Sequence, residues 1–524
     1  MKSTTRFTKI PDDQITPLVA ELLELIQLQI EEIQLLRDEI ARLKNQKPRP
    51  KIKPSILESA SKLRNARKRK RRQKKSKNKK IEIHEMISIK PDNIPNGSIF
   101  KGYQEYIVQD LVIGNWNTCY RRERWQMPSG DYISGQLPEH IAGSHFGSTL
   151  TAFILYQYYG CHVTQPLIKE QLCELGVDIS AGQINNIIIK NKDRFHQEKD
   201  QILSAGLKAS DYINVDDTGA RHNGQNGFCT HIGNEFFAWF KSTSSKSRIN
   251  FLDLLRCGRT DYILNDQAFE YMTDQEFPEY QLSRLLACKN KAFKNETRWT
   301  NFLKRQSIKD ERHKRIATEG ALIGSIVHHG FNPDLAIISD DAGQYKVFLH
   351  GLCWVHAERT IQKIVGFNDH QNEILEKTKT DIWRYYNELK KYRIKPNKKQ
   401  KRKLEDRFNR IFYTKTGFAT LDKALKRIYR NKNELLLVLK RPDIPLHNNL
   451  SERDIREYVK RRKVSGSTRC DAGKKCRDTF TSLKKTCRKL GISFWQYLID
   501  RIEYQNKYPP LSEIMTSKMI SSTG

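Results

Sequence analysis

Three features are scarce in this sequence, and each absence excludes a class of protein. The ten cysteines form no CxxC pair, so paired zinc knuckles are unlikely and the thiols are typical of a reduced compartment. No run of about 18 apolar residues could span a bilayer. The first residues, MKSTTRFTKIPDDQ, contain no apolar signal core. We therefore expect a soluble intracellular protein with no membrane partner.

Acidic residues are few relative to basic ones. The 524 residues include 93 Lys and Arg against 60 Asp and Glu, which gives a formal net charge of +33. A surface with this excess attracts polyanions, and nucleic acid is the leading candidate partner. A chain of this length should hold more than one folded unit, because a domain takes roughly 100–200 residues.

A heptad repeat runs through residues 15–43, and we predict residues 1–46 to be a coiled-coil dimerisation helix. One core position holds Val19, Ile26, Ile33 and Ile40, and the other holds Ile15, Leu22, Gln29, Leu36 and Leu43. β-Branched residues at one position with Leu at the other favour a parallel two-stranded coiled coil. This predicts a homodimer; the alternative is an amphipathic helix packed on the body of the protein.

Residues 47–80 read as a basic linker. Between positions 61 and 80 there are 13 Lys and Arg and no acid, a composition typical of a solvated segment that binds phosphates without reading sequence. An import signal would have the same composition. The predicted DNA contacts in this run are Arg67, Lys68, Arg69, Lys70, Arg71 and Arg72.

Two smaller regions follow the linker. Residues 81–140 alternate short β-rich runs with turn signals and predict a small β module. Residues 141–205 read as helical, and Pro166–Leu175, a break at Gly176 and a second helix capped by Ser180 have the length of a helix-turn-helix. Simple helical packing explains the same pattern, because the second helix is rich in Ile.

Two pairs of acids follow apolar, strand-like runs. Tyr212–Val215 ends at Asp216 and Asp217, and 335–338 ends at Ser339, Asp340 and Asp341. Between them lie two runs that meet at Gly233–Glu235 as a hairpin, and then a helical pattern. Three antiparallel strands, a helix and a parallel fourth strand beside the first match a ribonuclease H-like α/β layout.

This layout sets the predicted organisation of the remaining chain. The catalytic core comprises residues 206–366 and 441–506, with an insertion at about 259–314, a basic helical insertion at 367–440, and a tail at 507–524. A third acid, Glu452, lies in the first turn of a helical pattern, SERDIREYVKRR. Clustered carboxylates repel one another or hold hard divalent cations, which can activate a nucleophile for phosphoryl transfer.

The motifs NVDDTGAR, SDDAGQY, CWVHAER and NNLSERDIR, followed by VSGSTRCDAGKKCRDTFTSLKKTCRKLGISFWQYL, resemble the DDE transposases of the insertion sequence sixty-six family. The resemblance covers most of the chain. It implies a catalytic, metal-binding triad of Asp216, Asp340 and Glu452 with two Mg²⁺ or Mn²⁺ ions. It also implies double-stranded DNA as partner, at element ends and target, with accessory proteins as further partners and a bacterial, nucleoid-associated location in the cytoplasm.

Other positions carry over from the same resemblance. Cys353, His356 and Asn449 would shape the active site, although a buried Cys and a packed His explain the first two as well. Arg453, Arg456, Lys460, Arg461, Arg462 and Lys463 would contact DNA phosphates, or simply form a solvated helix face. The family often has paired cysteines in its N-terminal module, whereas residues 81–140 contain only Cys119, so zinc is unlikely here.

Three alternatives stay open at the level of sequence. Asp217 or Asp341 could replace its neighbour in the triad, because a one-residue slip turns a strand side chain to the other face. A catalytically inactive DNA-binding regulator would keep the zipper and the basic arm. A ribonuclease H-like nuclease would cut DNA without strand transfer.

Overall fold

The computed structural model describes residues 16, 18–19, 21–22, 25–26, 28–29, 32–33, 84–88, 103, 113–137 and 145–523. The ten described positions between Leu18 and Ile33 are helical, but most of the predicted coiled coil lies outside the described residues, and the dimer stays a prediction. The basic run 61–80, with the contacts predicted at Arg67–Arg72, also lies outside them. No described helix has the length and apolarity to cross a membrane.

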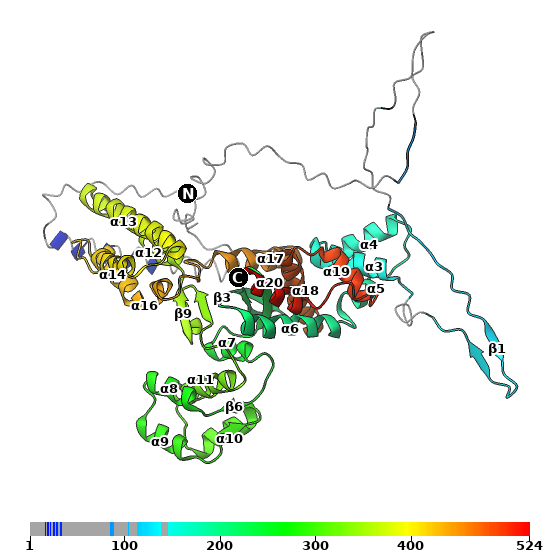
Figure 1. The fold of residues 1–524 in the computed structure, drawn as a ribbon, viewed down its shortest axis with the longest axis horizontal. Helices are drawn as coiled ribbons and strands as arrows, with labels where there is room; N and C mark the ends of the chain where they lie inside the picture. Colours follow the sequence, from blue (N-terminus) through cyan, green and yellow to red (C-terminus); the bar gives the residue numbers. More distant parts are fainter. Residues whose placement is uncertain are drawn as a thin grey trace, which may run out of the picture.

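A five-stranded mixed sheet forms the centre of the protein (Figure 1). Its strands are β3 (Tyr212–His222), β4 (Gln225–Gly233), β5 (Ala238–Thr243), β8 (Ala336–Ser339) and β9 (Leu349–Leu352). Their order is β5-β4-β3-β8-β9; β3, β4 and β5 are antiparallel neighbours, whereas β8 is parallel to β3 and β9 is parallel to β8. The predicted adjacency of the first and fourth strands is thus confirmed.

Strand β3 is longer than the sequence predicted. We expected it to end at Asp216, but its pairing with β4 continues to His222↔Gln225. The turn between these strands is Asn223–Gly224, with φ of 47° and 77°. An Asn-Gly pair with positive φ makes the two-residue turn that suits a twisted hairpin. Asp216 therefore lies inside β3, and the pairing of β3 with β4 fixes the position of its backbone.

Helices pack against the sheet, and further helices lie beyond one end of it (Figure 1). α17 (Asn449–Ser465) packs on β3 and β4, while α18 (Asp471–Leu490) packs on β5 and on α6 (Asp193–Ala209). α19 (Phe494–Ile502) packs on α3 (Ser148–Leu155), and α20 (Leu511–Thr523) packs on α6. The apolar side chains between α3, α6, α18, α19, α20 and the sheet form one core, and those of α17 form a smaller cluster with β3, β4 and β5.

The pair of helices predicted as helix-turn-helix-like is present as α4 (Gln165–Glu174) and α5 (Ala181–Ile189). Ser180 caps α5 in a reciprocal capping box with Gln183, as the sequence indicated, and Gly176 has φ 76° between the helices. Ile184 and Ile188 are fully buried, so this part of α5 packs on the body of the protein. DNA reading by the pair stays a prediction.

In the upstream region, β1 (Arg124–Gln126) and β2 (Tyr132–Ser134) form a short hairpin.

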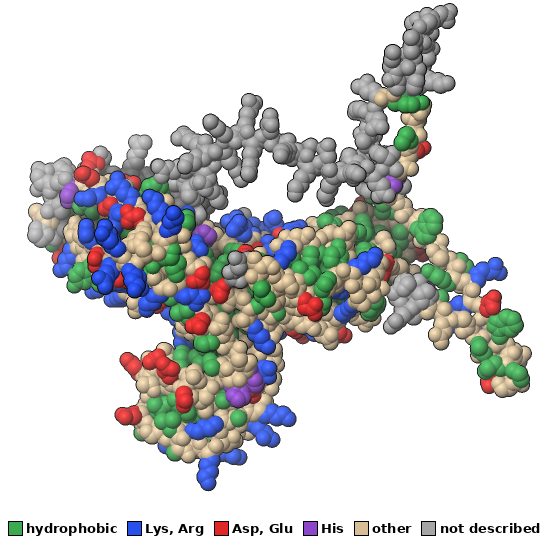
Figure 2. Space-filling model, in the orientation of Figure 1, with side chains coloured by type: hydrophobic (Ala, Val, Ile, Leu, Met, Phe, Trp, Pro, Cys, Tyr) green, Lys and Arg blue, Asp and Glu red, His purple; other side chains and the backbone are tan. Residues whose placement is uncertain are grey.

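Two helical insertions project from the sheet (Figure 1). The first follows α7 (Arg248–Leu255) and contains α8 (Asp266–Asp274), α9 (Glu279–Ala287) and α10 (Glu296–Arg305), with the short strands β6 (Tyr262–Ile263) and β7 (Ala292–Phe293); α11 (Glu311–His328) leads back to the sheet. The second contains α12 (Trp354–Gln362), α13 (Asp369–Ile394), α14 (Lys398–Phe412), α15 (Ala419–Arg430) and α16 (Lys432–Leu435). Its core is shared with the strands β8 and β9, and Trp354 packs there among Tyr385, Phe408 and Phe412. Lys and Arg side chains gather on its visible surface over α13 and α14 (Figure 2).

Candidate active site

Asp216 lies in β3, and Asp340 directly follows the end of the neighbouring parallel strand β8. In the parallel pairing of β3 and β8, Tyr212 is opposite Ala336 and Asn214 is opposite Ile338. Two residues further along each chain, Asp216 and Asp340 continue this register, because 216 − 214 and 340 − 338 both equal 2. Neighbouring strands are about 4.8 Å apart, so the two carboxyl groups emerge side by side.

Burial raises the pKa of both carboxyl groups. Burial, followed by the nearby charge of Asp340, raises the pKa of Asp216 to about 7, and Glu452 adds a smaller contribution of the same sign. Burial also raises the pKa of Asp340, against the opposing charge of His356. Their hydrogen bonds come only from the backbone: Asp217 N–H donates to Asp216 at 2.8 Å, and Ala342 N–H donates to Asp340 at 3.2 Å. Among the described residues, no cation forms an ion pair with either carboxylate.

Glu452 lies in the first turn of α17, as the sequence predicted. Its Oε1 accepts a hydrogen bond from Arg359 Nη1 at 3.2 Å and lies 3.5 Å from His356 Nε2. His356 is held in turn by Arg359, at 3.1 Å, on the same face of α12. Arg359 was missed by the sequence reasoning, although its position three residues after His356 places both side chains on one helical face.

The second acid of each pair has protein partners of its own. Asp217 Oδ2 accepts hydrogen bonds from Gln344 Nε2 and from the Tyr345 hydroxyl, both at 2.9 Å. Asp341 is bound by Arg427 at 2.9 Å, and Lys346 and Asn431 lie at 3.5 and 3.3 Å. Side-chain groups therefore bind Asp217 and Asp341, whereas among the described residues only backbone N–H groups donate to the carboxylates of Asp216 and Asp340.

Asn448 joins β3, the start of α12 and the start of α17. Its Nδ2 donates to Val215 O at 2.7 Å, and its Oδ1 accepts from Asn214 Nδ2 at 2.9 Å, which ties it to β3. Its backbone N–H donates to the buried thiol of Cys353 at 3.2 Å, at the start of α12. Cys353 therefore shapes this junction. Our sequence reasoning named the neighbouring Asn449 and missed Asn448; either Asn of the pair matched the motif.

We expect Asn448→Leu to lower the melting temperature and destabilise the core by about 2–4 kcal/mol. The substitution leaves the buried amide of Asn214 and the carbonyl of Val215 without partners, and each such group costs roughly 1–3 kcal/mol. Thermal and urea unfolding would measure the loss. Asn449→Ala is the matched control, because its side chain is only half-buried. Equal losses in both variants would contradict the role given to Asn448.

The basic residues predicted on α17 divide into two groups. Arg453, Arg456, Lys460 and Lys463 are exposed. Arg462 donates to the carbonyl of Gly219 on β3 and is half-buried.

The structure contradicts the prediction that Arg461 contacts DNA phosphates. Its side chain is 2% exposed, its guanidinium lies 3.6 Å from the centre of the Tyr158 ring, and it donates to Tyr158 O at 2.7 Å. Helical periodicity turns this position of α17 toward η2 (Tyr156–Gly160), so the charge holds α17 against that element and is not accessible to DNA.

The donor set fits a hard divalent cation in its chemistry. Two unpaired carboxylates on adjacent strands and a third on a facing helix are the oxygen ligands that Mg²⁺ and Mn²⁺ prefer. Within the described part of the chain, no group of three or more His, Cys, Asp or Glu is placed closely enough to form a metal site as it stands. The Glu452 carboxylate contacts Arg359 and His356.

The arrangement defines a mixed α/β protein with a carboxylate-lined site on a central sheet. Residues 288–475 match the Transposase IS66 family, and this segment includes Asp340 and Glu452. The chain is also 43% identical over 320 residues to the uncharacterised protein y4jO of Sinorhizobium fredii, an alignment that covers 60% of this chain and 100% of y4jO. The chain belongs to the Transposase IS66 family.

Proposed function

We propose that this transposase cuts the ends of its DNA element and joins them to target DNA through a triad of Asp216, Asp340 and Glu452 in a ribonuclease H-like core. The shared register of Asp216 and Asp340 on β3 and β8 carries the proposal. The strand order β5-β4-β3-β8-β9, with the first three strands antiparallel and the last two parallel, supports the assignment of the core.

Each residue has a defined task in this proposal. Asp216 and Asp340 would hold divalent cations from the sheet, and Glu452 would complete the site from α17. Bound Mg²⁺ or Mn²⁺ supplies an activated water or hydroxyl and stabilises the leaving oxygen of an in-line phosphoryl transfer. Arg359 and His356 contact Glu452 and would position it, and Asn448 would keep β3, α12 and α17 in fixed relation.

The exposed cations of α17 would bind the DNA backbone beside the triad. Arg453, Arg456, Lys460 and Lys463 lie on the helix that carries Glu452, so phosphates bound to them would lie next to the carboxylates. In the full-length protein, the 61–80 run and a homodimer through residues 1–46 would add affinity and pair two element ends. Steep loss of affinity with rising salt is the expected signature of these contacts.

Cleavage and strand transfer of labelled element ends with Mg²⁺ or Mn²⁺ tests the proposal. We expect metal-dependent products with the wild type, and none with Asp340→Asn or Glu452→Gln, while both variants still bind DNA. Asp274→Asn, at the exposed end of α8, is the matched control and should retain full activity. Cleavage without joining would favour the nuclease alternative, and binding without cleavage would favour the regulator.

A further inference from the structure

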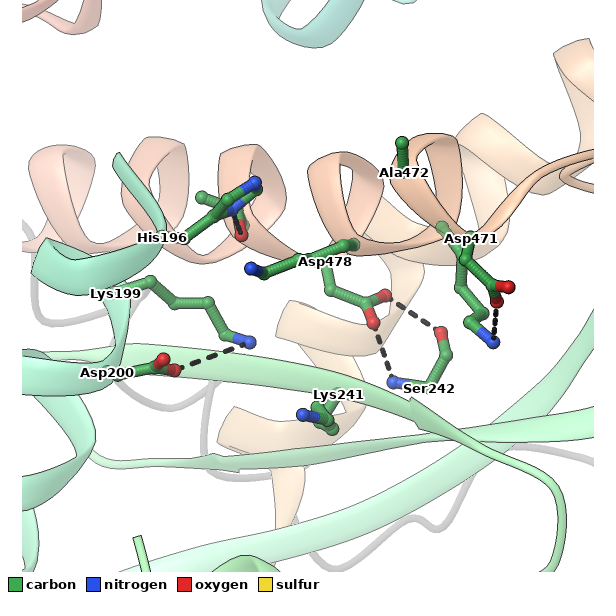
Figure 3. Close-up of a pocket in the computed structure, with 11 residues that line it drawn as sticks. His196, Lys199, Asp200, Lys241, Ser242, Asp471, Ala472 and Asp478 are labelled. Atoms are coloured by element: carbon green, nitrogen blue, oxygen red, sulfur yellow. Dashed lines mark hydrogen bonds and ion pairs between the residues drawn. The ribbon is translucent and has the colours of Figure 1, made fainter. Parts of the chain in front are cut away.

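A cavity of about 400 Å³ opens between α6, β5 and the first turns of α18 (Figure 3). None of its lining residues belongs to the acidic site. Four lysines line it, Lys199 from α6, Lys241 from β5, and Lys474 and Lys475 from α18. Its volume lies within the range of about 300–1,000 Å³ that is usual for small-molecule sites.

Lys199 is a buried cation that points into this cavity (Figure 3). Its side chain is 4% exposed, and its ammonium lies 4.5 Å from the centre of the Trp239 ring. Its one ion pair, with Asp200, is 3.8 Å long, and Asp200 is 67% exposed. No group in the described part of the chain forms a hydrogen bond with the ammonium. A buried charge without hydrogen bonds is costly, so the cavity wall holds a strong donor that an anionic ligand would satisfy.

Three aspartates line the cavity beside the four lysines; Asp471 and Asp478 are engaged with protein groups, whereas Asp200 is 67% exposed. Asp478 accepts hydrogen bonds from the Ser242 N–H at 2.7 Å and from the Ser242 hydroxyl at 2.8 Å. Asp471 pairs with Lys474 at 2.8 Å and with His222 at 3.3 Å. Lys241 and Lys475 are exposed and, within the described residues, form no ion pair. The available charge at the cavity is therefore positive.

The first turn of α18 adds to this preference for an anion. The helix is 20 residues long and begins at Asp471, and Asp471, Ala472 and the two lysines of its first turns line the cavity. Backbone N–H groups at a helix start carry partial positive charge and bind phosphate oxygens. Lys199 of α6 and the start of α18 therefore both favour an anion in the same cavity.

We propose that this cavity binds a phosphate group of a nucleotide, either one within a DNA strand or a free nucleotide. The DNA source rests on the proposed function. His222, which contacts Asp471, lies six residues after Asp216 on β3, since 222 − 216 = 6. At about 3.3 Å per residue this is roughly 20 Å, or about six steps of duplex DNA at 3.4 Å each. A DNA segment bound at the acidic site would extend far enough to reach the cavity.

Salt-dependent DNA binding by the full-length protein tests the DNA source. We expect the double variant Lys241→Gln, Lys475→Gln to bind a labelled duplex about tenfold more weakly at physiological ionic strength, with a salt slope smaller by about 1. Both side chains are exposed, so the fold should be kept. The control Lys294→Gln, Lys309→Gln removes the same charge from exposed sites around α10 and should change binding less than twofold. Equal losses in both pairs would count against DNA as the source.

Thermal unfolding with deoxyadenosine monophosphate tests the free-nucleotide source. We expect this nucleotide to raise the melting temperature of the wild type and to have no effect on Lys199→Met, which keeps the side-chain length and removes the charge. A response to the nucleotide alone assigns the cavity to free nucleotides, and a response in the DNA assay alone assigns it to a DNA strand. No response in either assay overturns the proposal. Both assays run without divalent metal, so their outcome is independent of cleavage by the triad.

Discussion

Asp216→Asn is expected to reduce cleavage and strand transfer by at least about a thousandfold. Loss of one preorganised electrostatic group in an active site typically costs 10²–10³ in rate, and here the lost charge also holds the cation. Asp216 is largely buried beside the like charge of Asp340 and has no ion-pair partner among the described residues. The measurement is the rate of product formation from labelled element ends, at DNA concentrations that saturate both proteins.

Asp217→Asn is the matched comparison for Asp216→Asn. It makes the same chemical change one residue away, at a carboxylate bound by Gln344 and Tyr345. Adjacent residues of a strand point to opposite faces, so this side chain cannot replace Asp216 without a shift in register. We expect its activity to fall less than about tenfold, through local loosening of β3. The opposite ranking of the two variants would move the triad to Asp217.

The second large effect is expected on stability, at Glu457 of α17. Glu457 Oε1 binds the ammonium of Lys484, whose side chain is 2% exposed, and lies 2.8 Å from His162 Nε2. Removing one partner of a buried ion pair costs roughly 3–5 kcal/mol, because the other charge stays buried without compensation. We expect Glu457→Gln to lower the urea midpoint of the core accordingly. Glu376→Gln is the control, since Glu376 is 71% exposed beside Lys379 and such pairs contribute about 0–1 kcal/mol.

The same carboxylate predicts how stability depends on pH. The hydrogen bond with His162, and then the contact with Lys484, lower the pKa of Glu457 well below its usual value. An unfolded Glu titrates near pH 4.3. The native state therefore binds fewer protons than the unfolded state at low pH. This contribution is complete above about pH 5 and is lost as the pH falls further. Urea midpoints measured between neutral pH and pH 4 should fall less in Glu457→Gln than in the wild type.

Local patterns determined a large part of the structure. The apolar runs before Asp216 and Asp340 are the central strands, Gly233–Glu235 is a hairpin turn, and Glu452 lies in the first turn of its helix. Each of these features depends on residues close together in the chain, so periodicity and turn chemistry were sufficient to predict them. The end of β3 was misplaced because the acids were taken as the end of the strand, whereas Asn223–Gly224 is the actual turn.

The sequence alone determined the acidic motifs, the excess of basic charge, the order of the strands and helices, and the resemblance to a transposase family that the chain proves to belong to. Only the tertiary structure decided which side chains are free to act. It gave Asp217 and Asp341 partners from Tyr345 and Arg427, buried Arg461 against Tyr158, and placed Asn448 between three segments. These contacts join residues from about 86 to more than 300 positions apart, and long-range packing of this kind has no local signal in the chain.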